Sequence, residues 1–203
     1  MKLEVRDLSF WYEEKGRQIL SQFSLSADSS ERVGIIAPSG SGKTTLCKIL
    51  SEYEMPQSGE VLLDGKPLKE YGTYCPVQMI WQHPEQAFDP RLRIGRSIQE
   101  VAGLDEDRLE GLLGAFGVRP DWLSRRPHEL SGGELMRVAM ARALVSGPRY
   151  LVADESTAML DAVTQAELWH VLMGLQEREG WGMALVSHSP DLLSRVATRT
   201  VRL

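Results

Sequence analysis

A glycine-rich turn that ends in a lysine and two threonines is the first feature able to do chemistry. It consists of Ala37-Pro38-Ser39-Gly40-Ser41-Gly42-Lys43-Thr44-Thr45. Gly40 and Gly42 let the backbone curl so that successive N–H groups point inward at phosphate oxygens. Lys43 can then reach the β and γ phosphates of a nucleotide, and the Thr44 hydroxyl can bind Mg²⁺. We therefore predict a phosphate-binding loop, the P-loop, in which residues 39–45 contact the nucleotide.

The first position of this loop departs from the usual P-loop pattern, because Ala37 replaces its first glycine. An alanine requires a backbone conformation that an L-residue can adopt. A glycine- and serine-rich surface loop would be the structural alternative. Such a loop has no need of Lys43 and Thr44 directly after the second glycine, so the phosphate-binding interpretation is preferred.

Two adjacent acids follow an apolar segment that is predicted to be a strand. The apolar segment is Tyr150-Leu151-Val152-Ala153, and the acids are Asp154 and Glu155. Asp154 is placed to bind Mg²⁺ through water, and Glu155 to orient and deprotonate the water that attacks a phosphate. An Asp-Glu pair at a strand end is also typical of a helix cap or a solvated turn. The pair therefore indicates catalysis only in combination with the P-loop.

A second anion-binding terminus is predicted where a serine and two glycines open a helix, at Leu130-Ser131-Gly132-Gly133-Glu134. The serine offers a hydroxyl, and the glycines offer unhindered backbone amides. Here the sequence resembles the ABC ATPase family, whose signature motif is LSGGQ. Glu134 replaces the glutamine, outside the Ser-Gly-Gly core.

The resemblance assigns roles to three further residues. Gln82 stands where the family has its Q-loop, a catalytic position that also contacts Mg²⁺, and Asp161 resembles the D-loop at the nucleotide. His188, in Val186-Ser187-His188, resembles the catalytic switch histidine. Each has a structural alternative: a polar loop residue for Gln82, a helix N-cap for Asp161, and a surface loop histidine for His188. Their order along the chain favours the family roles.

Tyr12 fits the upstream aromatic residue that stacks on adenine in this family. Trp11 is its neighbour, and residues of a strand alternate between faces. Only one of the two side chains can therefore face the nucleotide, and Tyr12 is preferred.

The order of the predicted elements indicates an α/β protein. Short strands are expected near the N-terminus, at Leu3, Val5 and 8–12, then 19–25, 33–37, 60–63 and 77–81, and a mostly helical block at 94–126. After it, the predicted helices 133–145 and 162–178 alternate with strands 150–153 and 183–186. This alternation is typical of parallel βαβ units.

The family resemblance implies an α/β fold of the P-loop NTPase class. It has a RecA-like core, an antiparallel β edge and an inserted helical subdomain at about 84–130, within a single ABC ATPase domain that spans 1–203. ATP and Mg²⁺ are the implied cofactors, and ATP hydrolysis is the implied activity. In this family two ATPase subunits pair head to tail, so that residues 131–133 of one chain close over ATP on the P-loop of the other. The implied partner is a second copy or a paralogue.

The composition limits the partners. In a chain of 203 residues with 42% apolar side chains, one substantial core is expected, and no apolar run approaches the roughly 20 residues that cross a bilayer. A membrane role therefore requires a partner, the permease. The net charge of −5 argues against nucleic acid. With only Cys47 and Cys75 and no signal peptide expected, we predict a cytoplasmic protein, peripheral on the cytoplasmic face of the membrane.

A narrower resemblance concerns Gln82-His83-Pro84 and Phe88-Asp89-Pro90-Arg91, which look like a stretch of the oligopeptide and nickel importer ATPases. It implies transport of solute through the permease, with peptide or nickel as the uptake substrate. Phe88 either docks a permease loop or packs inside the helical subdomain. The alternative function is a soluble ABC-type ATPase that is not coupled to transport. Such proteins in translation usually carry two domains, and those in DNA repair carry a long coiled coil, and neither feature is found in this sequence.

Overall fold

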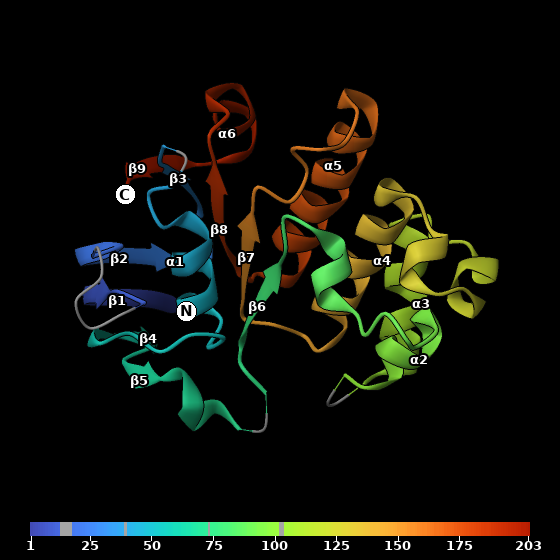
Figure 1. The fold of residues 1–203 in the computed structure, drawn as a ribbon, viewed down its shortest axis with the longest axis horizontal. Coiled ribbons are helices and arrows are strands. Elements are labelled where there is room, and N and C mark those ends of the chain that lie inside the picture. Colours follow the sequence, from blue (N-terminus) through green and yellow to red (C-terminus); the bar gives the residue numbers. More distant parts are fainter. Residues whose placement is uncertain (13–17, 39, 73, 102–103) are drawn as a thin grey trace. The chain divides into compact units, whose positions relative to one another are not determined.

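The computed structural model describes residues 1–12, 18–38, 40–72, 74–101 and 104–203. These residues form two compact units, whose elements are labelled in Figure 1. Unit 1 comprises Met1–Met79, Arg149–Glu155 and Gln176–Leu203. Unit 2 comprises Ile80–Pro148 and Ser156–Leu175.

Unit 1 contains the predicted antiparallel edge as a four-stranded sheet. Its strands are β1 (Lys2–Phe10), β2 (Leu20–Asp28), β4 (Ser58–Leu63) and β5 (Lys66–Pro67), in the order β2-β1-β4-β5. Strand β1 is antiparallel to both β2 and β4. It buries Leu3 and Val5 on one face, as expected from the period of two in a strand. Because β1 ends at Phe10, Trp11 and Tyr12 lie beyond the strand, and the predicted extension to residue 12 is wrong.

The second sheet has five strands, in the order β6-β7-β8-β3-β9. They are β6 (Val77–Ile80), β7 (Tyr150–Asp154), β8 (Gly182–Ser187), β3 (Arg32–Ile36) and β9 (Arg199–Arg202). Strand β8 is parallel to both β7 and β3, and β3 is also parallel to β9. Every residue of β7 and β8 is buried, which is typical of parallel strands covered on both faces. The predicted parallel core is confirmed.

Two helices of unit 1 contact this sheet, as Figure 1 shows. Helix α1 (Lys43–Leu50) follows β3 and buries Leu46, Ile49 and Leu50. Helix α6 (Pro190–Val196) follows β8 and contacts β3 and β8. Neither α6 nor β9 (Arg199–Arg202) was predicted from the sequence. The short 3₁₀ turn η1 (Leu68–Tyr71) follows β5.

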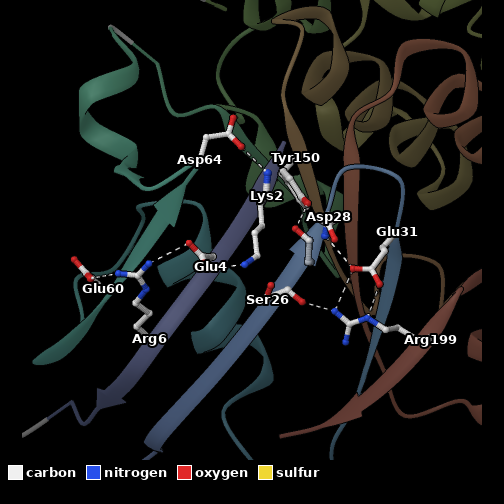
Figure 2. Close-up of polar contacts among 11 residues, drawn as sticks. Lys2, Glu4, Arg6, Ser26, Asp28, Glu31, Glu60, Asp64, Tyr150 and Arg199 are labelled. Atoms are coloured by element: carbon white, nitrogen blue, oxygen red, sulfur yellow. Dashed lines mark hydrogen bonds and ion pairs between the residues drawn. The ribbon is translucent and has the colours of Figure 1, made fainter.

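Polar contacts join the two sheets of unit 1 (Figure 2). The Tyr150 hydroxyl on β7 donates to the carbonyl oxygen of Ala27 on β2. Arg199 on β9 donates to both carboxylate oxygens of Glu31, at 2.7 and 3.2 Å, and to the carbonyl oxygen of Ser26. These contacts hold the antiparallel sheet to the strands that carry the candidate site.

Unit 2 is built from helices around its own core. It contains α2 (Ile94–Gln99), α3 (Glu106–Ala115), α4 (Gly132–Val145), most of α5 (Ala162–Glu179) and the 3₁₀ turns η2 (Pro84–Ala87), η3 (Pro120–Ser124) and η4 (Pro127–Glu129). The predicted helical block is thus several short pieces separated by turns. Phe88 is only 7% exposed and packs in a cluster with Ile94, Trp122 and Leu135. Phe88 was predicted either to dock a permease loop or to pack inside the helical subdomain, and the structure shows it packed inside unit 2.

Candidate nucleotide site

The P-loop connects β3 to α1 and has the backbone that its glycines require. Gly40 has φ 75° and Gly42 has φ 92°, both in the region that L-residues rarely adopt. A Cβ at Gly42 would also lie 2.6 Å from Ile19 Cγ2. Ala37 is not among the described residues with positive φ, as expected from its side chain. Ser39, a predicted contact of the nucleotide, lies outside the described residues.

Lys43 is held within the P-loop by three oxygen atoms. Its Nζ donates to the carbonyl oxygen of Pro38 at 2.9 Å and to that of Ala37 at 3.3 Å. The same Nζ lies 3.2 Å from Glu155 Oε1, and the lysine is 8% exposed. The ammonium group is therefore already in the loop, next to the predicted catalytic acid.

Glu155 is the residue directly after β7, and its two carboxylate oxygens have different partners. Oε1 pairs with Lys43, and Oε2 lies 3.1 Å from Nδ1 of His188, the residue after β8. The Glu155 N–H donates to the Val186 carbonyl at 2.9 Å. Its φ of 42° is unusual for a residue with a side chain and costs roughly 1–3 kcal/mol. Such strain is typical of functional positions, and here it accompanies a side chain placed between a lysine and a histidine.

The pKa of Glu155 lies below its usual value. Burial raises the pKa, but hydrogen bonds from His188 and Lys43 and the lysine charge together lower it by more. The carboxylate is therefore ionised at neutral pH, the form in which it can accept a proton from water.

Asp154, the last residue of β7, has the properties of a metal ligand. It is 1% exposed, and its Oδ1 has no hydrogen-bond partner among the described residues. Burial raises the pKa of this carboxyl above its usual value, although a hydrogen bond with the exposed Thr44 opposes the shift. Within the described residues, no group of three or more His, Cys, Asp or Glu side chains could hold a metal. One carboxylate beside a hydroxyl fits Mg²⁺, which usually keeps several waters and shares phosphate ligands.

Tyr12 lies beside the first turn of α1. Its hydroxyl is 3.0 Å from Thr45 Oγ1, its ring meets Phe10 edge-on, and the residue is 60% exposed. Trp11 is only half-buried, and its backbone exchanges two hydrogen bonds with the Gln57 side chain. Of the two residues, Tyr12 is the more exposed, and it lies next to a P-loop residue.

In unit 2, the other predicted site residues line one cavity of about 490 Å³. Gln82, the Ser131-Gly132-Gly133-Glu134 segment and Asp161 all contribute to its wall. Asp161 Oδ1 accepts the backbone N–H groups of Val163 and Thr164, both at 3.0 Å. The N-cap alternative for Asp161 is thus observed, and a contact with nucleotide stays a prediction. The structure brings Lys43, Asp154, Glu155 and His188 together in unit 1, and the remaining motifs together in unit 2.

One residue of this cavity was missed by sequence reasoning. Ser156 is 3% exposed, lines the cavity, and has a hydroxyl without a hydrogen-bond partner among the described residues. The signal available in the sequence was its position directly after the Asp154-Glu155 pair. A buried hydroxyl that is not bonded costs free energy unless a ligand satisfies it.

Known proteins share the sequence pattern and the fold of this chain. The sequence pattern of the ABC transporter family matches residues 20–158. The chain is 34% identical to the nickel import ATP-binding protein NikE of Rhodospirillum rubrum, over 97% of this chain and 76% of that protein. A solved ATP-binding subunit of an ABC transporter superposes with a TM-score of 0.85 at 26% identity, covering 100% of this chain and 86% of that one. The dimeric bacterial ABC transporter cassette MJ0796 has a TM-score of 0.83 at 24% identity, over 99% and 94% of the two chains.

The fold and the site define a P-loop NTPase of the α/β class. The chain belongs to the ABC transporter family, in which it is an ATP-binding subunit that hydrolyses ATP. Among the described residues, no helix combines the length and the apolar character needed to cross a bilayer.

Proposed function

We propose that ATP binds at the carboxyl ends of β3, β7 and β8 and that its hydrolysis drives transport through a separate permease. The observation that carries this proposal is the pairing of Glu155 with Lys43 on one side and His188 on the other, at 3.2 and 3.1 Å. Ligands of open α/β sheets bind at this edge, where loops from adjacent strands meet. One chain thus supplies a cation, a carboxylate and a histidine at one point.

In this proposal the P-loop, residues 39–45, surrounds the phosphates with backbone N–H groups. Lys43 exchanges its carbonyl partners at Ala37 and Pro38 for β- and γ-phosphate oxygens, which are stronger acceptors because they are charged. Tyr12 stacks on the adenine with its exposed ring.

The catalytic step is assigned to Glu155 and His188. Once Lys43 turns to the phosphates, one carboxylate oxygen of Glu155 becomes available to orient a water molecule and accept its proton. His188 holds the other oxygen and thereby fixes the direction of the carboxylate. We further assign to His188 a contact with the γ-phosphate.

Thr44, Asp154 and Gln82 are the residues proposed to hold Mg²⁺. The unpartnered Oδ1 of Asp154 and the exposed Thr44 support the first two, and Gln82 rests on the family resemblance. When bound, Mg²⁺ would neutralise charge on the phosphates and favour displacement at the γ-phosphate.

We propose that the N-terminal end of α4, Ser131 to Gly133, binds a different nucleotide from the one on the P-loop of the same chain. Asp161 lines the same cavity and is proposed to contact that nucleotide as well. Two chains would pair head to tail, each closing this end over ATP on the P-loop of the other. The fold is shared with a cassette solved as a dimer, which supports this arrangement. The partner is either an identical chain or a paralogue, and the mixing experiment below applies to a pair of identical chains.

The permease is the proposed membrane partner, with this chain on the cytoplasmic face. The relative NikE acts in nickel import, and the Gln82-His83-Pro84 stretch resembles the oligopeptide and nickel importers. We propose nickel or peptide as the solute class on these two grounds. The helical pieces of unit 2 that follow Gln82 would receive the permease loop.

A mixing experiment tests the shared site. Lys43→Ala removes the cation of the P-loop, and Ser131→Arg blocks the N-terminal end of α4. A homodimer of either variant therefore has no intact composite site. A mixed pair keeps one intact composite site, and ATPase activity should return on mixing to a fraction of the wild-type rate. As an independent check, a disulfide crosslink can be sought between a Ser131→Cys chain and a Ser41→Cys chain. Absence of both the crosslink and the recovered activity would contradict the head-to-tail arrangement.

A further inference from the structure

The N-terminus of α4 is closed by a reciprocal pair of hydrogen bonds. Glu134 Oε2 accepts the backbone N–H of Ser131 at 2.8 Å, and Ser131 Oγ accepts the backbone N–H of Glu134 at 3.4 Å. This arrangement is a capping box, in which the residue before the helix and the third helical residue satisfy each other. The bond made by the carboxylate is the shorter one, so Glu134 is the main restraint on Ser131.

The capping box determines which donors remain for a ligand. The N–H groups of Ser131 and Glu134 are both used inside the box. Ser131 Oγ accepts with a lone pair, so its own proton stays free to be donated. Gly132 and Gly133 occupy the first helical positions, whose N–H groups have no partner within a helix, and a Cβ at Gly132 would meet nothing within 4 Å. One hydroxyl and two amides are therefore left for a ligand at this end of α4.

An independent observation indicates that a ligand belongs here. The buried Ser156, whose hydroxyl has no partner among the described residues, lines the same cavity as Ser131, Gly132 and Gly133. A cavity wall with a helix N-terminus and an unused hydroxyl is suited to an anion with several oxygen atoms.

Glu134 also brings a negative charge to this anion-binding end. Its hydrogen bond from the Ser131 backbone lowers the pKa of the carboxyl below its usual value, so the group is ionised at neutral pH. A carboxylate in the first turn interacts favourably with the helix dipole. The same charge repels a phosphate that approaches the helix end, and a glutamine at this position would keep the hydrogen bond without the repulsion.

We propose that Glu134 is a positioning residue for phosphate binding at α4: it holds Ser131 so that the serine hydroxyl and the two glycine amides face one phosphate, and its charge lowers the affinity for that phosphate. This inference rests on the proposed function, because it takes the phosphate to be that of ATP on the partner chain. Glu134 itself does not touch the nucleotide.

Two variants of the full chain separate positioning from charge. Glu134→Gln keeps the acceptor oxygen and removes the charge, so KM for ATP should fall by about two- to five-fold, with kcat within about two-fold of wild type. Glu134→Ala is also neutral but loses the acceptor. Its kcat/KM should be about two- to ten-fold lower than that of Glu134→Gln, as expected for one hydrogen bond. Melting temperatures of both variants, measured alongside, show whether each is folded at the assay temperature.

Glu129 provides a matched control. Glu129 Oε2 accepts the backbone N–H of Arg126, three residues earlier in the chain, at 2.6 Å. Glu129→Gln therefore makes the same chemical change as Glu134→Gln, but at the short turn η4. This variant should keep the wild-type KM and kcat. A fall in KM equal to that of Glu134→Gln would assign the effect to net charge and overturn the inference.

The remaining outcomes distinguish this inference from the proposed function. Equal kcat/KM values for Glu134→Gln and Glu134→Ala would overturn the positioning role, and a wild-type KM for Glu134→Gln would overturn the effect of charge. Ser131→Arg should abolish turnover whichever of these results is found. If Ser131→Arg retained wild-type turnover, the end of α4 would not bind the nucleotide, and the proposed function itself would fail.

Discussion

The Nζ atom of Lys43 lies 3.2 Å from Oε1 of Glu155, so the lysine of the P-loop and the predicted general base form an ion pair. The pair is largely buried, with the two side chains 8% and 11% exposed. A nucleotide that binds the P-loop competes with Glu155 for the ammonium group. In the proposed function, phosphate binding would therefore release the carboxylate for catalysis through this one side chain.

Replacing Lys43 with alanine should weaken ATP binding by about 10- to 100-fold, because one charge-assisted hydrogen bond to phosphate is lost. The affinity can be measured by titration calorimetry or with a fluorescent ATP analogue. Lys66→Ala is the control, since Lys66 is an exposed lysine on β5. Equal affinity in the wild type and Lys43→Ala would remove Lys43 from the nucleotide site.

The position of Phe88 in the core of unit 2 predicts a structural role. Phe88→Ala should lower the free energy of unfolding by about 3–5 kcal/mol, the usual effect of removing a buried aromatic side chain. Urea denaturation measures this change. Val163→Ala, at a residue 68% exposed on α5, should change stability by less than about 0.5 kcal/mol. A Phe88→Ala chain of unchanged stability that loses stimulation by the permease would instead show that Phe88 docks the partner.

The contact of Glu31 with Arg199, drawn in Figure 2, predicts a pH dependence of stability. The pKa of Glu31 is lowered by hydrogen bonds from Arg199 and from the backbone of Asp28, against a smaller effect of burial. A depressed carboxyl pKa stabilises the fold above the unfolded value of about 4.5, and this stabilisation is lost as the pH falls through the folded value.

Glu31→Gln should therefore be less stable than wild type by about 1 kcal/mol at pH 7. The difference should shrink as the pH falls below about 4.5, which denaturation curves at several pH values can measure. Glu177→Gln is the control, because Glu177 makes a long contact of 3.5 Å with Arg32 and is 67% exposed. A difference that stays constant, or grows, in acid would contradict the assigned role of the Glu31 carboxylate.

Much of the fold could be predicted because the motifs and the strand periodicity are local in the sequence. The strand–loop–helix unit around Gly42, the buried β7 before Asp154 and the start of α4 after Ser131 all depend on neighbouring residues. Helix α6 was not predicted, because it has only seven residues and its burial depends on packing against β3 and β8. Short elements of this kind are determined by tertiary contacts rather than by propensity.

For the candidate site, the sequence predicts residue types and positions but not the contacts between them. The pairing of Glu155 with both Lys43 and His188 joins three chain segments, and no spacing in the sequence specifies it. The unpartnered hydroxyl of Ser156 is likewise a property of burial. By contrast, the capping box of Glu134 has a sequence signal, a serine followed three residues later by a glutamate.

The central claim is that Glu155 is the general base. Single-turnover hydrolysis of ATP by Glu155→Gln, with ATP affinity measured on the same sample, tests it most directly, and Glu60→Gln at an exposed strand residue is the control. Hydrolysis should fall by about 10²- to 10⁴-fold, the usual effect of losing such a base. ATP should bind at least as well as to wild type, because Lys43 no longer pairs with a carboxylate. Hydrolysis at the wild-type rate would contradict the account.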